Sequence, residues 1–327
     1  MQQVKLDGTP DGSPVAYALP AQQEEPELLS ANAQGGRVAF LWKTFVKVPS
    51  EQAPEDYEVV DFASTDESGT HSTPAEVENY GAHSPVGSSE LWLQVTSAGS
   101  WLAVGILHPN APSLWEATAG STIAGWSALS PTIFESEAFG LLGSTLMLTG
   151  SDCTPVNSSC TASFKLQRYS AASLAANGPP ISLSPNIQSI KSAMGPVGDA
   201  MALLWTETQS PGQLFRASIK EDGTFAQPIG SVQSAIIPKV VVQSADGGAL
   251  LIGTIVTVSG SGTVYQVVAQ RLDANLNLIE NPLPLADGQS EDADTFETRL
   301  SSDGKQMLTT YHQLGARFRV LNTNGCN

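Results

Sequence analysis

Short apolar runs alternate with polar, glycine-containing turns along the whole chain. The clearest example is the run at 249–258, which follows the turn sequence Ser-Ala-Asp-Gly-Gly at 244–248. Short runs rich in β-branched and aromatic residues predict β-strands, and runs that are apolar on both faces predict strands buried between two layers. The predicted strands lie at 38–45, 57–62, 91–95, 101–107, 146–149, 163–169, 201–206, 214–219, 239–243, 249–258, 264–272, 306–311 and 316–321.

Helices are nearly absent from the pattern. No long stretch has the period of about 3.6 residues that an amphipathic helix requires. The best helix candidate, 171–176, is stopped by the sequence Asn-Gly-Pro-Pro that follows it. The chain is therefore predicted to be all-β.

A unit of one turn and one apolar strand recurs along the chain. The recurring segments are 30–42, 95–104, 138–148, 192–205, 244–252 and 301–308. Each unit continues with a polar loop, a strand bearing a charged residue, a second tight turn and a strand containing proline. Because proline donates no hydrogen bond to a ladder, this last strand is expected at the sheet edge.

Four antiparallel strands in a repeat of about 50 residues are typical of a propeller blade. Over nearly its whole length the chain resembles the β-propeller superfamily. The Asp-Gly turns at 244–248 and 301–305 are similar to those of TolB-type propeller domains, and 271–275 resembles a blade segment of secreted or surface bacterial propellers. No Trp-Asp pair recurs, as a WD40 chain would require, and 244–248 lacks the aromatic residue of a sialidase Asp-box.

The resemblance implies a single β-propeller domain over 1–327. Its blades are predicted at 23–74, 80–131, 133–184, 186–233, 234–286 and 287–327, after an N-terminal closing segment at 1–22.

Ring closure is expected to join the two ends of the chain. Residues 317–325 predict a third strand and its turn with no fourth strand after them, and 13–19 offer the missing strand. A shared blade would remove the open edge of the ring. Residues 4–8 also resemble a third strand, so two segments compete for one position. Six blades are favoured; seven irregular blades, or a β-sandwich of two sheets or two domains, are the alternatives.

Composition narrows the classes of partner. Charged residues make up 14% of the chain, against about 25% in an average soluble protein, which is typical of secreted β proteins. The 32 acidic and 15 basic residues give a net charge of -17, which excludes nucleic acid as a partner and disfavours anionic lipid.

No run of about 18 apolar residues predicts a membrane span. Residues 1–5 lack the apolar core of a signal peptide, so the protein is either cytosolic or has lost a leader.

The cysteines bear on the compartment. Cys153 and Cys160 flank a short polar loop, and their spacing suits a disulfide worth about 2.5 kcal/mol. A zinc site would need two further ligands, and no histidine is close. A disulfide implies an extracellular, periplasmic or cell-surface location, whereas two free thiols are the alternative. Cys326 is left as a free thiol or an intermolecular link.

Acidic clusters are the candidate metal ligands. The segment 287–297 carries five carboxylates, and 51–58 carries four. Calcium requires about six to eight oxygen ligands, and Asp287, Asp292 and Asp294 are the candidates to supply some of them. The spacing departs from that of an EF-hand loop, so the alternative is a solvated acidic rim.

Tryptophans are the candidate binding residues. Trp115 and Trp126 lie in an irregular stretch rich in glycine, serine and threonine, where exposed rings would stack on sugars or contact a partner protein. Core packing is the alternative for both. Trp42 and Trp205 end the apolar second strands of two predicted blades and are expected to pack between blades.

No catalytic motif assembles in the sequence. None of His71, His83, His108 and His312 is spaced as a metal pair, and no Gly-x-Ser-x-Gly elbow precedes a helix. The sequence therefore predicts a non-enzymatic secreted or surface propeller that binds a protein or carbohydrate partner through one loop-lined face. The alternatives are a hydrolase or lyase with its site at the central channel, and a structural component of a larger surface assembly.

Overall fold

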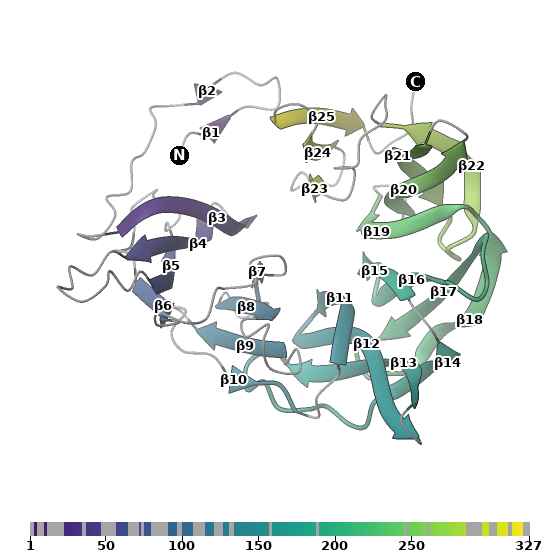
Figure 1. Ribbon diagram of the computed structural model, residues 1–327, viewed down its shortest axis with the longest axis horizontal. Helices are drawn as coiled ribbons and strands as arrows, with labels where there is room; N and C mark the ends of the chain where they lie inside the picture. Colours follow the sequence, from purple (N-terminus) through teal and green to yellow (C-terminus); the bar gives the residue numbers. More distant parts are fainter. Residues whose placement is uncertain are drawn as a thin grey trace. The chain divides into compact units, whose positions relative to one another are not determined.

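The computed structural model is built of β-strands joined by turns (Figure 1). The chain divides into two compact units, 1–132 and 133–327. The residues that the structure describes are 3–4, 10–11, 23–34, 37–46, 57–64, 72, 75–79, 91–96, 100–106, 115–120, 127–130, 134–156, 159–187, 190–244, 247–259, 262–285, 296–300, 306–312 and 316–322.

The first unit contains two four-stranded antiparallel sheets. The strands of the first sheet, in spatial order, are β3 (Gln23–Gln34), β4 (Arg37–Val46), β5 (Tyr57–Ser64) and β6 (Ala75–Asn79). Those of the second sheet are β7 (Leu91–Val95), β8 (Trp101–Ile106), β9 (Trp115–Gly120) and β10 (Ser127–Ala128). A short separate pairing joins β1 (Gln3–Val4) and β2 (Pro10–Asp11). The ring of Phe62 meets that of Trp101 edge-on at a centroid distance of 6.2 Å, so the two sheets share a core.

The second unit contains three four-stranded sheets and one three-stranded sheet among its described residues. The strands of these sheets, sheet by sheet, are β11 (Phe134–Leu142), β12 (Thr145–Val156), β13 (Ser159–Ser170) and β14 (Ile181–Ile187); β15 (Ile190–Val197), β16 (Ala200–Glu207), β17 (Gln213–Lys220) and β18 (Phe225–Gln233); β19 (Ile236–Gln243), β20 (Ala249–Ser259), β21 (Gly262–Leu272) and β22 (Leu278–Pro284); and β23 (Phe296–Leu300), β24 (Gln306–His312) and β25 (Ala316–Asn322).

The predicted all-β class with four-stranded antiparallel sheets is confirmed. In each sheet the strands are neighbours in sequence order, which is the order that the repeat predicted. The helix candidate 171–176 was wrong: its first residues form a turn, and Ala176 makes an antiparallel bridge to Tyr169. The turn closes instead of continuing as a helix, because the Ser170 amide donates to the Ala175 carbonyl at 2.9 Å and Leu174 has a φ of 58°, outside the right-handed helical region.

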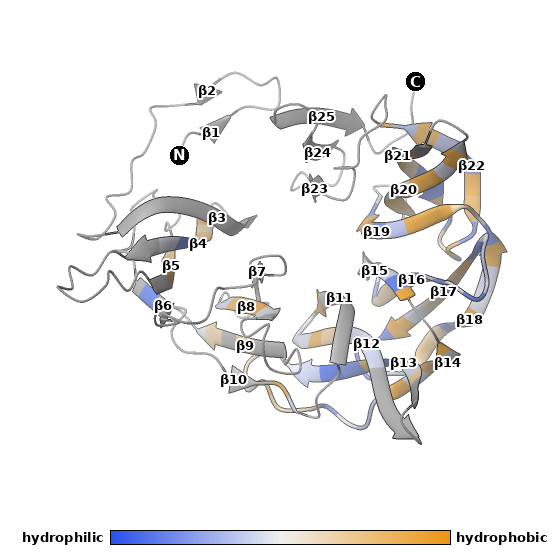
Figure 2. Ribbon diagram, in the orientation of Figure 1, coloured by the Kyte–Doolittle hydropathy of each residue, from blue (hydrophilic) through white to orange (hydrophobic). Residues whose placement is uncertain are grey.

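The core of the second unit lies between successive sheets. On β16, Leu203 and Trp205 pack on the side of the β11–β14 sheet, whereas Ala202 and Leu204 pack on the side of the β19–β22 sheet. A strand buried on both faces must be apolar at consecutive positions, which is why 201–205 is an unbroken apolar run. Figure 2 shows the corresponding apolar residues along β19 and β20 in orange.

The first strands of the three four-stranded sheets are neighbours, since β15 contacts both β11 and β19. Glycine permits the closest of these approaches. A Cβ atom added to Gly195 on β15 would lie 2.0 Å from the Val241 carbonyl oxygen on β19. Within the β19–β22 sheet, one added to Gly253 on β20 would lie 2.2 Å from the Ile237 carbonyl oxygen on β19. These contacts are with backbone, which cannot rotate out of the way.

In the second unit, turns at the end of the sheet opposite the segments that connect one sheet to the next join two successive pairs of sheets. The Glu221 carboxylate accepts hydrogen bonds at 2.7 Å from the Ser144 amide, at 2.7 Å from its hydroxyl, and at 3.1 Å from the Thr145 hydroxyl. Arg168 of β13 donates to the Glu221 carbonyl at 3.1 Å. Arg216 of β17 likewise donates to the Asn275 carbonyl in the turn of the following sheet. The same docking of a turn on an arginine thus occurs at two successive sheet pairs.

The Glu221 contacts make the stability of this link dependent on pH. The Ser144 hydroxyl, followed by the Ser144 amide, lowers the pKa of Glu221 below its usual value. A carboxyl with a lowered folded-state pKa stabilises the fold above its unfolded pKa, and this contribution is lost as the pH falls through the folded pKa. We expect Glu221→Gln to cost about 1 kcal/mol or less at pH 7, since the site is partly exposed.

The Tm of wild type and variant, measured between pH 7 and pH 3, checks this expectation. The difference should shrink as the pH falls, because protonated glutamic acid and glutamine make similar hydrogen bonds. Glu76→Gln, at an exposed position on β6, is the control. A Glu221→Gln difference that stays constant over this pH range would contradict the link.

Candidate functional site

Most of the sequence-predicted site residues lie outside the residues that the structure describes. Trp126, Asp287, Asp292 and Asp294 belong to this group, and Trp115 is described only as the first backbone position of β9. The stacking tryptophans and the calcium ligands therefore stay predictions. Within the described part of the chain, no group of three or more His, Cys, Asp or Glu side chains could hold a metal ion.

Cys153 and Cys160, the cysteines of the predicted disulfide, lie on neighbouring strands. The loop predicted between them is wrong, because β12 continues to Val156 and β13 begins at Ser159. The register pairs Cys153 with Ala162 and Cys160 with Pro155, so the two cysteine backbones are two positions out of direct register. The disulfide itself stays a prediction.

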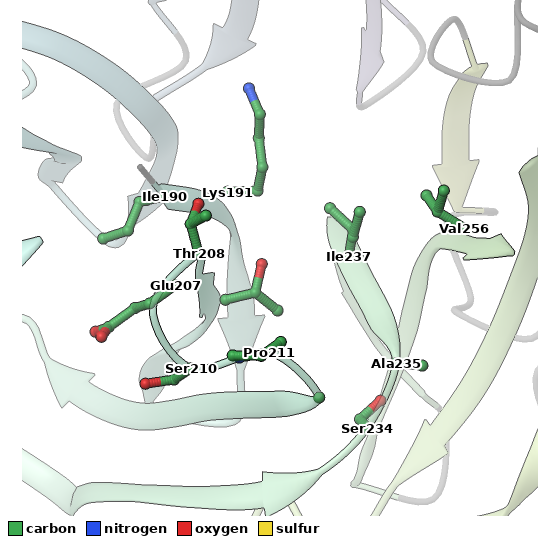
Figure 3. A pocket seen from close by; sticks show the side chains of 12 residues that line it. Ile190, Lys191, Glu207, Thr208, Ser210, Pro211, Ser234, Ala235, Ile237 and Val256 are labelled. Atoms are coloured by element: carbon green, nitrogen blue, oxygen red, sulfur yellow. The ribbon is translucent and has the colours of Figure 1, made fainter. Parts of the chain in front are cut away.

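A pocket of about 420 Å³ lies between the β15–β18 sheet and the β19–β22 sheet (Figure 3). It opens at the end where β15 and β19 begin and where the turn between β16 and β17 lies. In a sheet of four consecutive antiparallel strands, the segment that leads into the first strand and the turn between the second and third strands lie at the same end. The lining residues are Ile190, Lys191, Thr206, Glu207, Thr208, Ser210, Pro211, Gly212, Ser234, Ala235, Ile237 and Val256.

One wall of the pocket continues the packed face of β15 and β16. Lys191 stands directly opposite Thr206 in the strand register. Both positions share the face of Ala193 and Leu204, which pack toward the β19–β22 sheet. Along this face, buried apolar residues give way to a hydroxyl and an ammonium group where the core ends, so the pocket is the polar, open end of the interface between the two sheets.

Small residues in the turn and the connector leave the space open. The Ser234 amide donates to the Gly212 carbonyl at 2.9 Å, and the Ser234 hydroxyl accepts from the Ile236 amide at 3.2 Å. The Ser210 amide donates to the Glu207 carbonyl at 3.0 Å. Internal hydrogen bonds therefore hold both segments in place around the pocket.

The one carboxylate in the lining is turned into the protein. Glu207 is only 7% exposed, and its two oxygens accept from the Trp205 indole at 3.1 Å and from the Gln209 amide at 2.9 Å. Figure 3 shows this carboxylate and the Lys191 ammonium pointing away from each other. A buried carboxylate with two donors is positioned to hold the turn rather than to exchange protons with a ligand.

Sequence reasoning did not identify the pocket. Its lining comes from positions near the ends of four strands (β15, β16, β19 and β20), a turn and a connector, none of which carries a motif. One signal in the sequence could have indicated it. The apolar run at 201–205 changes to Thr-Glu-Thr at 206–208, directly before the turn between the second and third strands of the sheet.

The protein has the β-propeller fold, as comparison with solved structures shows. It is similar to a protein of unknown function from Dyadobacter fermentans, with a TM-score of 0.51 and 12% identity over 91% of this chain and 93% of that one. It is also similar to the β-propeller domain of the trilobed protease from Pyrococcus furiosus, with a TM-score of 0.52 and 8% identity over 92% and 82%.

A third similar structure is an acylaminoacyl peptidase from Pyrococcus horikoshii, with a TM-score of 0.51 and 7% identity over 91% of this chain and 45% of that one. At these identities the likeness concerns the fold alone. No protein-family model matches the sequence, and no curated protein does. In the described part of the chain, no helix has the length and apolar character needed to cross a membrane.

Proposed function

We propose that this protein is a non-enzymatic β-propeller that binds a protein or glycan partner through the face on which the pocket opens. The pocket at the end of the β15–β18 and β19–β22 interface carries the proposal, because concave sites lined by apolar groups and a few polar ones are typical of ligand binding. A protein partner is favoured over a glycan. The lining contains threonine, serine, isoleucine, valine and proline but no aromatic ring on which a sugar would stack.

A hydrolase or lyase is supported less well. The lining contains no histidine or cysteine, and its single carboxylate is held by Trp205 and Gln209. A general acid or base must reach the proton that it transfers. The two peptidases among the similar structures support the fold only.

The architecture proposed with this function is a ring of six blades. In the described residues, five sheets have four strands and the last has three, which leaves one position for a further strand. The segment 13–19 would fill that position and close the ring. The alternative is an open ring, since the propeller of the Pyrococcus furiosus protease has an open velcro topology.

The proposed location is extracellular, periplasmic or at the cell surface. Its support is the low fraction of charged residues, 14%, together with the predicted disulfide between Cys153 and Cys160. A role as a structural component of a surface assembly is the second candidate, and Cys326 would then lie at a contact.

A random peptide library displayed on phage and selected on the full-length chain tests the binding proposal. We expect enriched peptides whose affinity falls roughly tenfold or more in Thr208→Arg, because a long side chain at this exposed position would occupy the pocket. Ala226→Arg is the control, since Ala226 is also exposed but lies on β18, outside the lining. If no enriched peptide distinguished the two variants, the proposal of a protein partner would fail. Binding to a glycan array that depended on Thr208 would identify a glycan as the partner instead.

A further inference from the structure

The hairpin of β20 and β21 extends beyond the rest of its sheet at the end where the pocket opens. β19 begins at Ile236, which pairs with Ile255 of β20. Past this pair, β20 continues over 256–259 and pairs with β21 alone. In the described part of the chain, no strand pairs with the other edge of this β20 extension. A strand edge of this kind offers backbone N–H and C=O groups to an added strand.

The β20 extension carries two apolar side chains on one face. Val256 lines the pocket, and Val258 lies two positions further along an unbroken register, so both side chains point to the same side of the strand. Val258 is 79% exposed, the highest value among the exposed large hydrophobic residues that the structure describes. A single exposed valine is ordinary, but this one continues the lining of a pocket and enlarges its apolar surface.

Both charged groups of the lining already have partners within the protein. The Glu207 carboxylate accepts from Trp205 and Gln209, and Lys191 is engaged by an interaction of its own. A charged side chain that entered the pocket would have to displace one of these partners or lose water without compensation. An uncharged apolar side chain has no such cost.

The rest of the lining suits an uncharged occupant. Pro211, Ile237 and Val256 supply apolar surface, and Figure 3 shows the last two on the side of the pocket formed by the β19–β22 sheet. The space of about 420 Å³ falls within the range of about 300–1,000 Å³ that is usual for ligand sites.

From these observations we infer that an extended segment of a protein partner pairs with the β20 extension and places an uncharged apolar side chain in the pocket. Strand addition of this kind takes its affinity from backbone hydrogen bonds and its specificity from alternate side chains. Residues two positions apart on an extended segment are separated by about 7 Å, as Val256 and Val258 are on β20, so a second apolar residue of the partner contacts Val258. This inference rests on the proposed function, because it names the chemistry of the partner at the same site.

The peptides selected above test the side-chain part of the inference. We expect the Thr208-dependent peptides to share two uncharged apolar residues separated by one position. Val258→Ser should weaken their binding roughly fivefold, and exchanging the apolar residue that enters the pocket for Asp or Lys should weaken it roughly tenfold or more. Affinities from isothermal titration at low and high salt should agree within about twofold, since no new ion pair forms. Ile229→Ser is the matched control, because Ile229 is an exposed apolar residue on β18, outside the lining.

Backbone methylation of the same peptides tests the strand pairing. An added strand directs every second amide toward β20, so methylating single peptide nitrogens should weaken binding at alternate residues. If Thr208-dependent peptides required a charged residue, bound Val258→Ser as well as wild type, or showed no alternation on methylation, the inference would be overturned while the proposed function stood. A dimer of the free chain in sedimentation velocity that Val258→Ser abolished would overturn it too, with a second copy as the occupant. If no peptide depended on Thr208, the proposed function itself would fail.

Discussion

Replacing Gly195 with alanine is expected to lower the free energy of unfolding by about 3 kcal/mol. The new Cβ atom would lie 2.0 Å from the Val241 carbonyl oxygen and 2.8 Å from its carbonyl carbon, which belong to the next sheet. Because the obstacle is backbone, β15 and β19 would have to separate, and the apolar packing between their sheets would loosen with them. Urea unfolding followed by circular dichroism measures the loss.

Gly230→Ala supplies the control for this experiment. The atoms nearest to a Cβ at Gly230 belong to the flexible end of Arg216, the closest at 3.8 Å, so this variant should change stability by about 0.5 kcal/mol or less. Gly253→Ala should behave like Gly195→Ala, because its Cβ would lie 2.2 Å from the Ile237 carbonyl oxygen. Equal stabilities for Gly195→Ala and Gly230→Ala would contradict the close approach of β15 and β19.

The all-β class and the strand order could be predicted because each sheet is built from consecutive strands. The signals involved are local: Asp222-Gly223 forms the turn between β17 and β18, and 201–205 is apolar throughout because β16 is covered on both faces. Sequence patterns within ten or twenty residues therefore contain most of the information about this kind of sheet. Contacts between sheets, such as that of Glu221 with Ser144, join residues far apart in sequence, so no local sequence pattern predicts them.

The turn between β21 and β22 shows where local turn chemistry misleads. Asparagine tolerates positive φ better than most residues, and Asn275 and Asn277 both lie in this turn, yet the residue with φ of 57° is Leu276. Two features offset its strain. Leu276 is 1% exposed within the core, and the Asp273 carboxylate accepts from the backbone amides of Asn275 and Asn277, each at 2.8 Å. Burial alone would raise the pKa of Asp273. The hydrogen bonds from the Asn277 side chain and from these two backbone amides outweigh burial, so the pKa lies below its usual value.

The candidate pocket could not be predicted because its chemistry depends on which face each strand residue occupies. Glu207 and Thr206 are adjacent in sequence, but one turns toward Trp205 and the other toward the next sheet. A shift of one position in the strand would exchange them and place the carboxylate in the pocket. A strand assignment from sequence implies that side chains alternate between the two faces of β16. It does not say which face packs on which neighbouring sheet.

Truncation of Trp205 to alanine is the second change with a large expected effect, about 4 kcal/mol in the free energy of unfolding. Trp205 is completely buried, and its packing between blades is confirmed by its place in the core shared by two sheets. Its ring stacks on Phe215 at a centroid distance of 5.5 Å and meets Phe164 at the same distance. Removing it leaves a cavity that β-sheet backbone cannot readily close.

Trp205→Phe separates the packing of the ring from its hydrogen bond. Phenylalanine keeps most of the aromatic contact but deprives one oxygen of the buried Glu207 carboxylate of its indole donor, which should cost about 1–3 kcal/mol. Adding Glu207→Gln should recover part of this loss, because a neutral amide is less costly to leave short of a partner than a carboxylate. Urea unfolding of the two single variants and the double variant gives the coupling energy between the residues. Additive losses would mean that Trp205 stabilises the sheet through packing alone and does not hold the Glu207 carboxylate away from the pocket.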